Sequence, residues 1–214
     1  MEHISIYYKQ IQSTVSQSNC TFSFQKELQQ TIHNVRDELF ESCLKNYGIL
    51  NKDYSLDKEL NGKPYFRSHP HLHFNISHST DHLNFNTRSC VAVGFANTRL
   101  GIDIEFTRHI KSVAAKNICS KDEYDVYVSH TCPDEYLTRL WTLKEAYCKY
   151  TGKGLQTPFH TLHFIPIGNM EHAFIYQIEH HSDVILYQYE LEDHLWLSVC
   201  TDAHNSSPVQ IIKV

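Results

Sequence analysis

The sequence predicts an α+β protein built from two halves, and three observations support this fold class. A long helical pattern occurs in each half, at residues 24–47 and again at 133–151. Short segments rich in β-forming residues accompany each helix, as is typical of antiparallel sheets. No low-complexity linker separates the halves, so we place the boundary near residue 100 and expect domains at 1–100 and 101–214.

The composition places the chain among soluble globular proteins that have neither a membrane span nor a nucleic-acid surface. Its 214 residues are 41% hydrophobic and 20% charged, which is sufficient for a core. No apolar run reaches the roughly 18 residues of a membrane helix, and no signal-peptide pattern opens the chain. The net charge of -5 and the sequence pI near 6.3 argue against a broad contact with nucleic acid.

The seven cysteines and sixteen histidines form no recognisable disulfide or metal motif. The cysteine number is odd and no C-x-x-C pair occurs, so we expect reduced thiols in a cytoplasmic protein. The densest histidine segments, at 69–74 and 179–181, lack the H-x-x-x-H spacing of helical zinc sites. We interpret the histidines as surface residues or as locally hydrogen-bonded ones.

The first half begins with a helix and continues with strands. Apolar residues recur at helical spacing from Leu28 to Leu44, and Gly48 follows as a stop signal. The turn signal "NGKP" precedes "LHFNIS" at 72–77, which predicts a strand that enters a polar loop. The apolar segments "CVAVGF" and "LGIDIEF", joined by "ANTR", predict a β-hairpin.

The second half combines one long helix with a series of strands. Pro133 and Asp134 are start signals, and Gly152 is a stop signal, for a helix that contains "WTLKEAYCK". Segments rich in β-forming residues follow at 159–164, 173–179, 184–191 and 195–201. Polar residues bound each of these segments, so together they predict an antiparallel sheet.

The segment "LGIDIEF" carries two acids in an otherwise apolar stretch. Side chains two residues apart in a strand share one face, so Asp103 and Glu105 point the same way, opposite to the apolar residues around them. Two neighbouring carboxylates repel each other unless a cation lies close to them. The strand therefore requires a cationic partner from elsewhere in the fold.

The predicted helix with "WTLKEAYCK" offers a third carboxylate. Trp141, Glu145 and Lys149 are four residues apart and lie along one helical face. Taken alone, they fit a solvated Glu145–Lys149 pair worth about 0.2–0.5 kcal/mol, with Trp141 against the core. If this face meets Asp103 and Glu105, three carboxylates form an oxygen-rich site that suits Mg²⁺ and a phosphate-bearing substrate.

These motifs resemble the signature of the 4′-phosphopantetheinyl transferases, and in particular the Sfp type, which activates surfactin synthetase. "GIDIE" at 101–105 and "WTLKEAYCK" at 141–149 have the order and spacing of the paired family motif. Four further segments occur in the family order: "GKP" at 62–64, "FNISHS" at 74–79, "CSKDEY" at 119–124 and "GKGL" at 152–155. Cys119 stands where the family usually has phenylalanine.

The resemblance implies a fold and a reaction. The fold would be two similar halves in a pseudo-twofold arrangement, with nucleotide contacts in the first half and the metal site and catalytic helix in the second. Family members transfer the 4′-phosphopantetheine arm of coenzyme A to a serine of an acyl or peptidyl carrier protein and release adenosine 3′,5′-bisphosphate. The chain would act as a monomer, with Mg²⁺ as its cofactor and Mn²⁺ as the alternative.

The same resemblance assigns roles to the acids and the lysine. Asp103, Glu105 and Glu145 would be the metal ligands, and a water would complete the shell beside Ile104. Asp103 would also belong to the coenzyme A site. Glu145 would act as general base for the serine hydroxyl, while Lys149 would contact the coenzyme and neutralise charge on the transferred phosphate.

The nucleotide contacts that the resemblance implies lie in the first half. Ser77 and His78 would hold phosphates of coenzyme A. Lys63 and Pro64 would face the adenine or the 3′-phosphate, and Arg36, on the first predicted helix, is a further candidate.

Two other classes of function stay open at this point. A Mg²⁺-dependent phosphohydrolase could use the same carboxylates on pyrophosphates like that of coenzyme A, without a carrier protein. A non-catalytic module that binds coenzyme A is the second alternative, although the intact set of acids and Lys149 argues against it. We interpret Cys148, next to the acidic stripe, as a packing residue because the transfer needs no covalent enzyme intermediate.

Overall fold

The computed structural model describes residues 3–14, 22–50, 53–83, 86–170, 172–204 and 208–214. These ranges contain two main sheets, a short two-stranded sheet, four α-helices and three 3-10 helices. Six of the seven cysteines are free thiols, as predicted, and Cys20 lies outside the described residues.

The first sheet has the strand order β11-β1-β5-β4. Its strands are β1 (Ile4–Thr14), β4 (His73–Leu83), β5 (Asn86–Ala96) and β11 (Val209–Lys213). Neighbouring strands are antiparallel except β1 and β11, which run parallel. The last strand therefore returns to the sheet that contains the first. A separate hairpin is formed by β2 (Leu56–Lys58) and β3 (Pro64–Phe66).

The second sheet has the order β6-β10-β9-β8-β7, and every pair in it is antiparallel, as predicted. Its strands are β6 (Leu100–Phe106), β7 (Phe164–Met170), β8 (Ala173–Ile178), β9 (His181–Leu191) and β10 (Leu195–Asp202). The strand predicted at 159–164 is wrong, because η2 (Phe159–Thr161) is a 3-10 helix. There the N–H groups of Thr161 and Leu162 bond back to the carbonyls of Pro158 and Phe159, which closes a turn.

The α-helices are α1 (Phe22–Asn46), α2 (Ser112–Ile118), α3 (Lys121–Ser129) and α4 (Pro133–Thr151). Both predicted stop signals are confirmed: Gly48 follows α1 and Gly152 ends α4, with φ of 72° and 75°, a conformation that favours glycine. Two short 3-10 helices, η1 (Gly154–Gln156) and η3 (Glu192–His194), lie in connections. No helix within the described ranges combines the length and the apolar character needed to cross a membrane.

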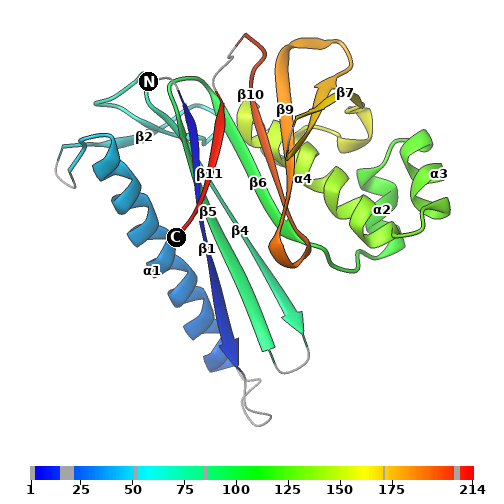
Figure 1. Ribbon diagram of the computed structural model, residues 1–214, viewed down its shortest axis with the longest axis horizontal. Coiled ribbons are helices and arrows are strands. Elements are labelled where there is room, and N and C mark those ends of the chain that lie inside the picture. The colour runs from blue at the N-terminus through cyan, green and yellow to red at the C-terminus, as the bar shows by residue number, and fades with distance from the viewer. Residues whose placement is uncertain (1–2, 15–21, 51–52, 84–85, 171, 205–207) are drawn as a thin grey trace.

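The elements form four layers in the order α1, first sheet, second sheet, α4 (Figure 1). α1 packs Leu39 and Leu44 against one face of the first sheet, where they meet Val93 and Phe95. The other face of that sheet shares a core with the second sheet, and Ile104 of β6 is fully buried there. α4 covers the far face of the second sheet. Each half therefore packs one long helix on a sheet, which confirms the predicted α+β class.

The predicted hairpin between β5 and β6 is wrong, because the two strands belong to different sheets. β6 pairs with β10 instead, with Asp103 opposite Ser198. The link between β5 and β6 contains Arg99, whose Nε donates to the Tyr150 carbonyl at 2.6 Å and whose guanidinium pairs with Glu59. These contacts hold the link at the end of α4, so the chain crosses there from one sheet to the other.

Gly101 allows β6 to lie directly against α4. A Cβ at this position would lie 2.1 Å from the Ala146 carbonyl oxygen and 2.3 Å from the Tyr150 nitrogen. Both are backbone atoms of α4, which cannot rotate away as a side chain can. Asp103 and Glu105 alternate with the apolar residues of β6 as Gly101 does, so the same approach brings the two acids toward α4.

We expect Gly101→Ala to destabilise the protein by about 3 kcal/mol or more, because the clash is relieved only by moving α4 away from β6. Gly168→Ala in β7 is the matched control, since a Cβ there meets no atom within 4 Å. The control should change stability by less than about 0.5 kcal/mol. Urea unfolding followed by tryptophan fluorescence measures both, and equal stability of the two variants would contradict the close approach.

Candidate active site

β4 runs beside the outer edge of β6 and supplies polar side chains to it. Asn75, Ser77 and Ser79 are two residues apart, so they share one face of the strand. Their side-chain oxygens accept hydrogen bonds from three backbone N–H groups. The pairs are Ile102 N–H to Asn75 at 2.9 Å, Ile104 N–H to Ser77 at 3.3 Å and Phe106 N–H to Ser79 at 3.2 Å. Because β6 is the end strand of its sheet, these bonds replace a missing neighbouring strand.

The expected change from strand to loop after residue 77 is wrong. β4 continues to Leu83, so Ser77 and His78 lie in the middle of a strand. A signal for this arrangement is present in the sequence: "NISHS" has a polar residue at every second position, as "DIE" does in β6. Two segments with the same period of two are able to pair along their polar faces.

The serines of β4 hold the two acids of β6. The Ser77 hydroxyl donates to Asp103 Oδ1 at 2.8 Å, and the Ser79 hydroxyl donates to Glu105 Oε2 at 2.5 Å. The Ser77 oxygen also accepts from the Ile104 N–H and from the Lys149 ammonium, which uses its full hydrogen-bonding capacity. Ser77 is only 4% exposed. The structure therefore shows Ser77 orienting Asp103, with its hydrogen-bonding capacity taken up by protein groups.

Lys149 of α4 is the cation that the acids of β6 require. Its ammonium donates to Asp103 Oδ1 at 2.7 Å and to the Ser77 hydroxyl at 2.9 Å. Asp103 is 3% exposed, whereas the Lys149 side chain is 27% exposed, so the acid of this pair is shielded from water and the lysine is partly accessible. Glu145, half-buried, lies one turn earlier on the same helix. The sequence predicted a divalent cation close to these acids, and the structure adds the Lys149 ammonium beside Asp103 Oδ1.

The positive charges do not fully balance the acids. Burial, followed by the charge of Asp103, raises the pKa of Glu105 to about 7, even though Arg108 lies 3.5 Å from its Oε1. Burial and Asp103 also raise the pKa of Glu145. A site that raises carboxyl pKa values resists further negative charge and favours a proton or a cation.

The donor atoms of this site fit a hard divalent cation. Asp103 Oδ2 is buried and has no hydrogen-bond partner among the described residues, so one carboxylate oxygen is left for a ligand. Carboxylate and water oxygens are the ligands that Mg²⁺ prefers. In the part of the chain that the structure describes, no group of three or more His, Cys, Asp or Glu side chains is already arranged to hold a metal ion. The residues therefore fit Mg²⁺ by the chemistry of their carboxylate oxygens.

A pocket of about 460 Å³ lies between α1, the β2–β3 hairpin and the outer face of β4. Its lining residues are Arg36, Asp37, Phe40, Glu41, Tyr54, Leu56, Pro64, Phe74 and Ile76. Two of the predicted nucleotide contacts, Arg36 and Pro64, therefore meet in one pocket. The Arg36 guanidinium pairs with Asp37 at 2.8 Å and is 38% exposed, so it remains accessible to a ligand. Aromatic walls beside a guanidinium suit a purine that carries phosphate.

His78 lies on the same face of β4 as the pocket residue Ile76, two positions further along the strand. Its side chain is exposed at the surface. Partial burial of the imidazole, and then the charges of Lys149, His33 and Arg36, lower its pKa. A lowered pKa favours the neutral form of the His78 imidazole.

Lys63 is not among the residues that line the pocket. Its ammonium donates to the carbonyl oxygens of Leu100 and Lys149 at 2.7 Å and of Tyr150 at 3.1 Å. These bonds use all the N–H groups of an ammonium, and the residue is 8% exposed. Carbonyls, two of them at the end of α4, take up its charge in the structure and leave no N–H group for the predicted contact with the adenine or the 3′-phosphate.

Lys144 and Glu123 form a buried ion pair that the sequence analysis did not predict. The Lys144 ammonium is fully buried and donates to Glu123 Oε2 at 2.6 Å and to the carbonyls of Ile118 and Phe159. Glu123 also accepts from the Ser120 N–H in a capping box at the start of α3. The S-x-x-E pattern in "CSKDEY" is the signal for that cap. The pair fixes α3 against α4.

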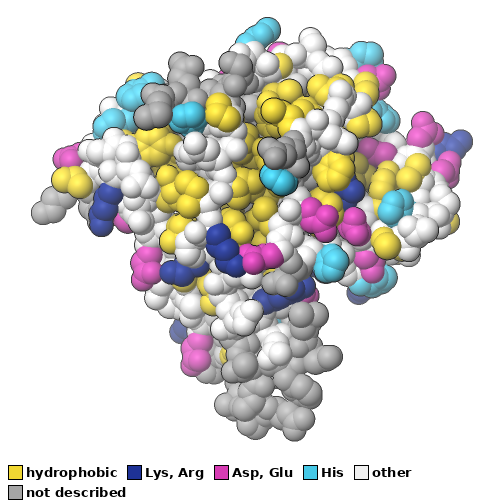
Figure 2. Space-filling model, in the orientation of Figure 1, with side chains coloured by type: hydrophobic (Ala, Val, Ile, Leu, Met, Phe, Trp, Pro, Cys, Tyr) yellow, Lys and Arg dark blue, Asp and Glu magenta, His cyan; other side chains and the backbone are white. Residues whose placement is uncertain are grey.

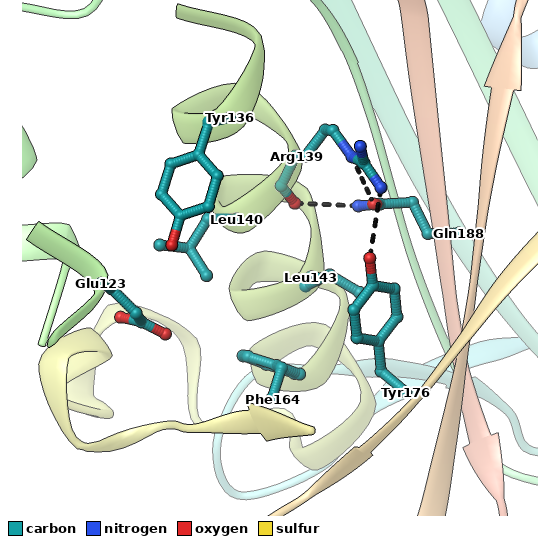
Figure 3. Close-up of a pocket in the computed structure, with 8 residues that line it drawn as sticks. All are labelled: Glu123, Tyr136, Arg139, Leu140, Leu143, Phe164, Tyr176 and Gln188. Carbon is teal, nitrogen blue, oxygen red and sulfur yellow. Dashed lines mark hydrogen bonds between the residues drawn. The ribbon is translucent and has the colours of Figure 1, made fainter. Parts of the chain in front are cut away.

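A second cavity, of about 260 Å³, is lined by residues of α3, α4, β7, β8 and β9 (Figure 3). Arg139 is held there by bonds to the Gln188 side chain at 3.0 Å and to the Tyr176 hydroxyl at 3.2 Å. Its guanidinium also stacks over Trp196 and Phe174. Arg139 therefore has a structural role in joining α4 to the second sheet.

Charged side chains are mixed on the surface of the molecule. On the face drawn in Figure 2, Lys and Arg side chains are scattered among Asp and Glu side chains and do not form one broad patch. The net charge of -5 agrees with this distribution.

Two neighbouring acids, one of them paired with a lysine, and an aromatic pocket with an arginine are groups that can bind a phosphorylated nucleotide together with a hard cation. Residues 99–203 match a family model described as the 4′-phosphopantetheinyl transferase superfamily. The chain is 30% identical to 4′-phosphopantetheinyl transferase Sfp of Bacillus subtilis (strain 168), over 78% of this chain and 74% of that protein. The chain belongs to the 4′-phosphopantetheinyl transferase superfamily, and its resemblance to the Sfp type is confirmed.

Two further similarities accompany this match. The 4′-phosphopantetheinyl transferase gsp of Aneurinibacillus migulanus is 28% identical over 85% of this chain and 76% of its own. Among solved structures, the holo-[acyl-carrier-protein] synthase of Thermotoga maritima is 17% identical and covers 50% of this chain and 64% of its own, with a TM-score of 0.38. The sequence relatives, which cover most of both chains, carry the family assignment.

We expect Glu105→Gln to stabilise the metal-free protein at pH 8 by about 1–3 kcal/mol. The pKa of Glu105 is raised to about 7, so the folded state binds a proton more tightly than the unfolded state does. The free energy of unfolding of the wild-type protein therefore falls as pH rises from about 4.5 to 7. Glutamine cannot ionise and escapes that loss, so the gain should vanish near pH 4.5. Thermal unfolding across pH 4–8 in a chelating buffer measures it, with exposed Glu38→Gln as control. A gain that does not depend on pH would contradict the explanation.

Proposed function

We propose that this protein transfers the 4′-phosphopantetheine arm of coenzyme A to a serine of an acyl or peptidyl carrier protein. The serine oxygen bonds to the phosphorus of the arm, the pyrophosphate P–O bond breaks, and adenosine 3′,5′-bisphosphate leaves. The observation that carries the proposal is the meeting of Asp103, Ser77 and Lys149 in one cluster beside the aromatic pocket. Names of the relatives point to the same reaction.

The aromatic pocket is proposed to receive the adenosine half of coenzyme A. Phe40 and Tyr54 offer faces for the purine, Pro64 packs at its edge, and Arg36 is the cation available for the 3′-phosphate. His78 would donate to the pyrophosphate, because its lowered pKa leaves it neutral with one N–H available. The pyrophosphate would then lie beside Asp103 and Lys149.

Asp103, Glu105 and Glu145 are proposed to hold Mg²⁺, with Mn²⁺ as the alternative. When bound, the ion would neutralise charge on the pyrophosphate oxygens. The unpartnered Oδ2 of Asp103 and the raised pKa values of the two glutamates support this set. Ser77 and Ser79 keep two of the acids in place by donating to them.

Glu145 and Lys149 are proposed to act on the reacting groups. A serine hydroxyl is a weak nucleophile at neutral pH, so a carboxylate with a raised pKa is a suitable acceptor for its proton. The Lys149 ammonium can stabilise the charge that develops on the phosphate as the P–O bond breaks. The two residues are one turn apart on α4 and therefore serve the same reacting centre.

The division of labour between the halves and the monomeric state belong to the same proposal. The pocket residues lie within 1–100, whereas the three acids and Lys149 lie within 101–214. Ser77, Asp103 and Lys149 meet within a single chain, which supports a site built within one copy. A monomer in the cytoplasm, where coenzyme A is available, is the expected form, and sedimentation of an obligate oligomer would contradict it.

One assay distinguishes the three classes of function. The protein is incubated with coenzyme A, Mg²⁺ and an apo carrier domain, and the carrier is then weighed by mass spectrometry. Transfer predicts that the carrier gains the mass of the phosphopantetheine arm, and that chelation of the metal abolishes the gain. Free phosphopantetheine with an unchanged carrier would indicate the phosphohydrolase, and binding without any product would indicate the non-catalytic module.

Glu145→Gln should lower kcat by about 10²–10⁴-fold, because glutamine keeps the size of the side chain but cannot accept the proton. The loss should persist at saturating Mg²⁺, since the base is absent whether or not the metal site is filled. Glu135→Gln, at a partly exposed acid near the start of α4 whose carboxylate lies 3.9 Å from Arg139, is the matched control and should keep full activity. Complete recovery of Glu145→Gln at high Mg²⁺ would leave Glu145 with a ligand role alone.

His78→Ala should weaken coenzyme A binding about 10-fold, the loss of roughly 1.4 kcal/mol expected for a hydrogen bond to a charged phosphate. Affinity for the carrier protein should stay unchanged, because the contact is made to one substrate only. His82→Ala, at the end of the same strand, is the control. Calorimetric titration with each partner measures the effect, and weakened carrier binding with unchanged coenzyme A affinity would reverse the assignment.

A further inference from the structure

The last turn of α4 is held by side chains from the first half of the chain. The final carbonyls of a helix lack partners within the helix and must find them elsewhere. Three side chains supply them. Lys63 donates to the carbonyls of Lys149 and Tyr150, Arg99 to those of Tyr150 and Thr151, and Asn61 to that of Thr151 at 3.2 Å. The end of the helix is therefore capped by distant segments that it contacts only in the folded protein.

Lys63 joins this cap to β6. The same ammonium that bonds to Lys149 and Tyr150 also donates to the Leu100 carbonyl, at the start of β6, at 2.7 Å. β6 carries Asp103, and the last turn of α4 carries Lys149. One buried cation therefore fixes the distance between the two elements whose side chains meet in the acid cluster.

The turn that carries Lys63 has little freedom to shift. A Cβ at Gly152, just past α4, would lie 2.5 Å from the Asn61 amide nitrogen, so the turn and the end of the helix are in close contact. Burial lowers the pKa of Lys63 to about 8, as expected for an ammonium withdrawn from water. The next residue, Pro64, lines the aromatic pocket. The position of Lys63 is thus fixed by the contact of its turn with Gly152, by the burial of its ammonium and by the packing of Pro64 at the pocket.

We propose that Lys63 is a positioning residue, which holds α4 against β6 so that Lys149 and Glu145 face Asp103. It contacts no substrate and affects the rate of transfer without affecting the affinity for coenzyme A. This role rests on the proposed function, and it differs from a phosphate contact, which would act on affinity. A displacement of reacting groups by about 1 Å can cost about 10²-fold in rate.

The test compares Lys63→Met with Lys58→Met. Methionine keeps the length of the side chain without the charge, and Lys58 is an exposed lysine of the same hairpin. Lys63→Met should lower kcat about 10²-fold. Its dissociation constants for coenzyme A and for dephospho-coenzyme A should each stay within about threefold of the wild-type values. Lys58→Met should change neither kcat nor the two dissociation constants. The proposal would be overturned if Lys63→Met had a normal kcat but bound coenzyme A more weakly than wild type, and no more tightly than it binds dephospho-coenzyme A. That result would make Lys63 a ligand of the 3′-phosphate.

A second measurement does not depend on transfer. Hydrogen–deuterium exchange of the amides at 146–152 should be faster in Lys63→Met than in wild type or Lys58→Met. If Lys63→Met does not fold, Asn61→Ala removes one weaker bond of the same cap and should show both effects to a smaller degree. Wild-type protein that fails to modify a carrier would refute the proposed function and leave the exchange result interpretable. Unchanged exchange in a folded variant, or faster exchange with a normal kcat, would overturn the positioning role.

Discussion

The outer edge of β6 is the constraint on which the rest of the structure depends. An end strand leaves its outward N–H groups without a neighbour, and a buried amide without a partner costs about 1–3 kcal/mol. Asn75, Ser77 and Ser79 meet that need. Because a hydroxyl accepts and donates at once, the two serines also fix Asp103 and Glu105. The junction of the two sheets and the orientation of the acids are therefore one hydrogen-bond network.

α4 completes this network and sets its charge. Lys149 donates to both Asp103 and Ser77, yet one ammonium is too little for the neighbouring carboxylates. Burial converts the deficit into the raised pKa values of Glu105 and Glu145. The acid cluster is therefore stabilised by an added cation and destabilised by an anion that binds alone. A pyrophosphate that arrives with a divalent cation meets this condition, whereas a bare pyrophosphate does not.

The features with strong local signals are predictable from the sequence. Nearby residues predict the start of α4 at Pro133 and its end at Gly152. They also predict that the two acids of β6 lie on the same face of the strand. The misassigned features depend on contacts between distant segments. By themselves, the serines of β4 suggest a loop. In the fold their oxygens accept hydrogen bonds from amides of β6, 27 residues later in the chain. By itself, Lys63 between a glycine and a proline suggests an exposed cation. In the fold its ammonium donates to carbonyls at the end of α4, 86 residues later in the chain.

The turn that contains Lys63 and Pro64 explains how a short motif serves two sites. Adjacent residues at the start of a strand point to opposite sides, so Pro64 meets the pocket while Lys63 meets α4 and β6. Lys149 is consequently held twice, by its carbonyl to Lys63 and by its ammonium to Asp103, each at 2.7 Å. With its backbone fixed, only the side-chain torsions of Lys149 stay free to follow a substrate phosphate. That restriction lowers the entropy lost when the Lys149 ammonium is positioned beside the charge that develops on the phosphate in the proposed reaction.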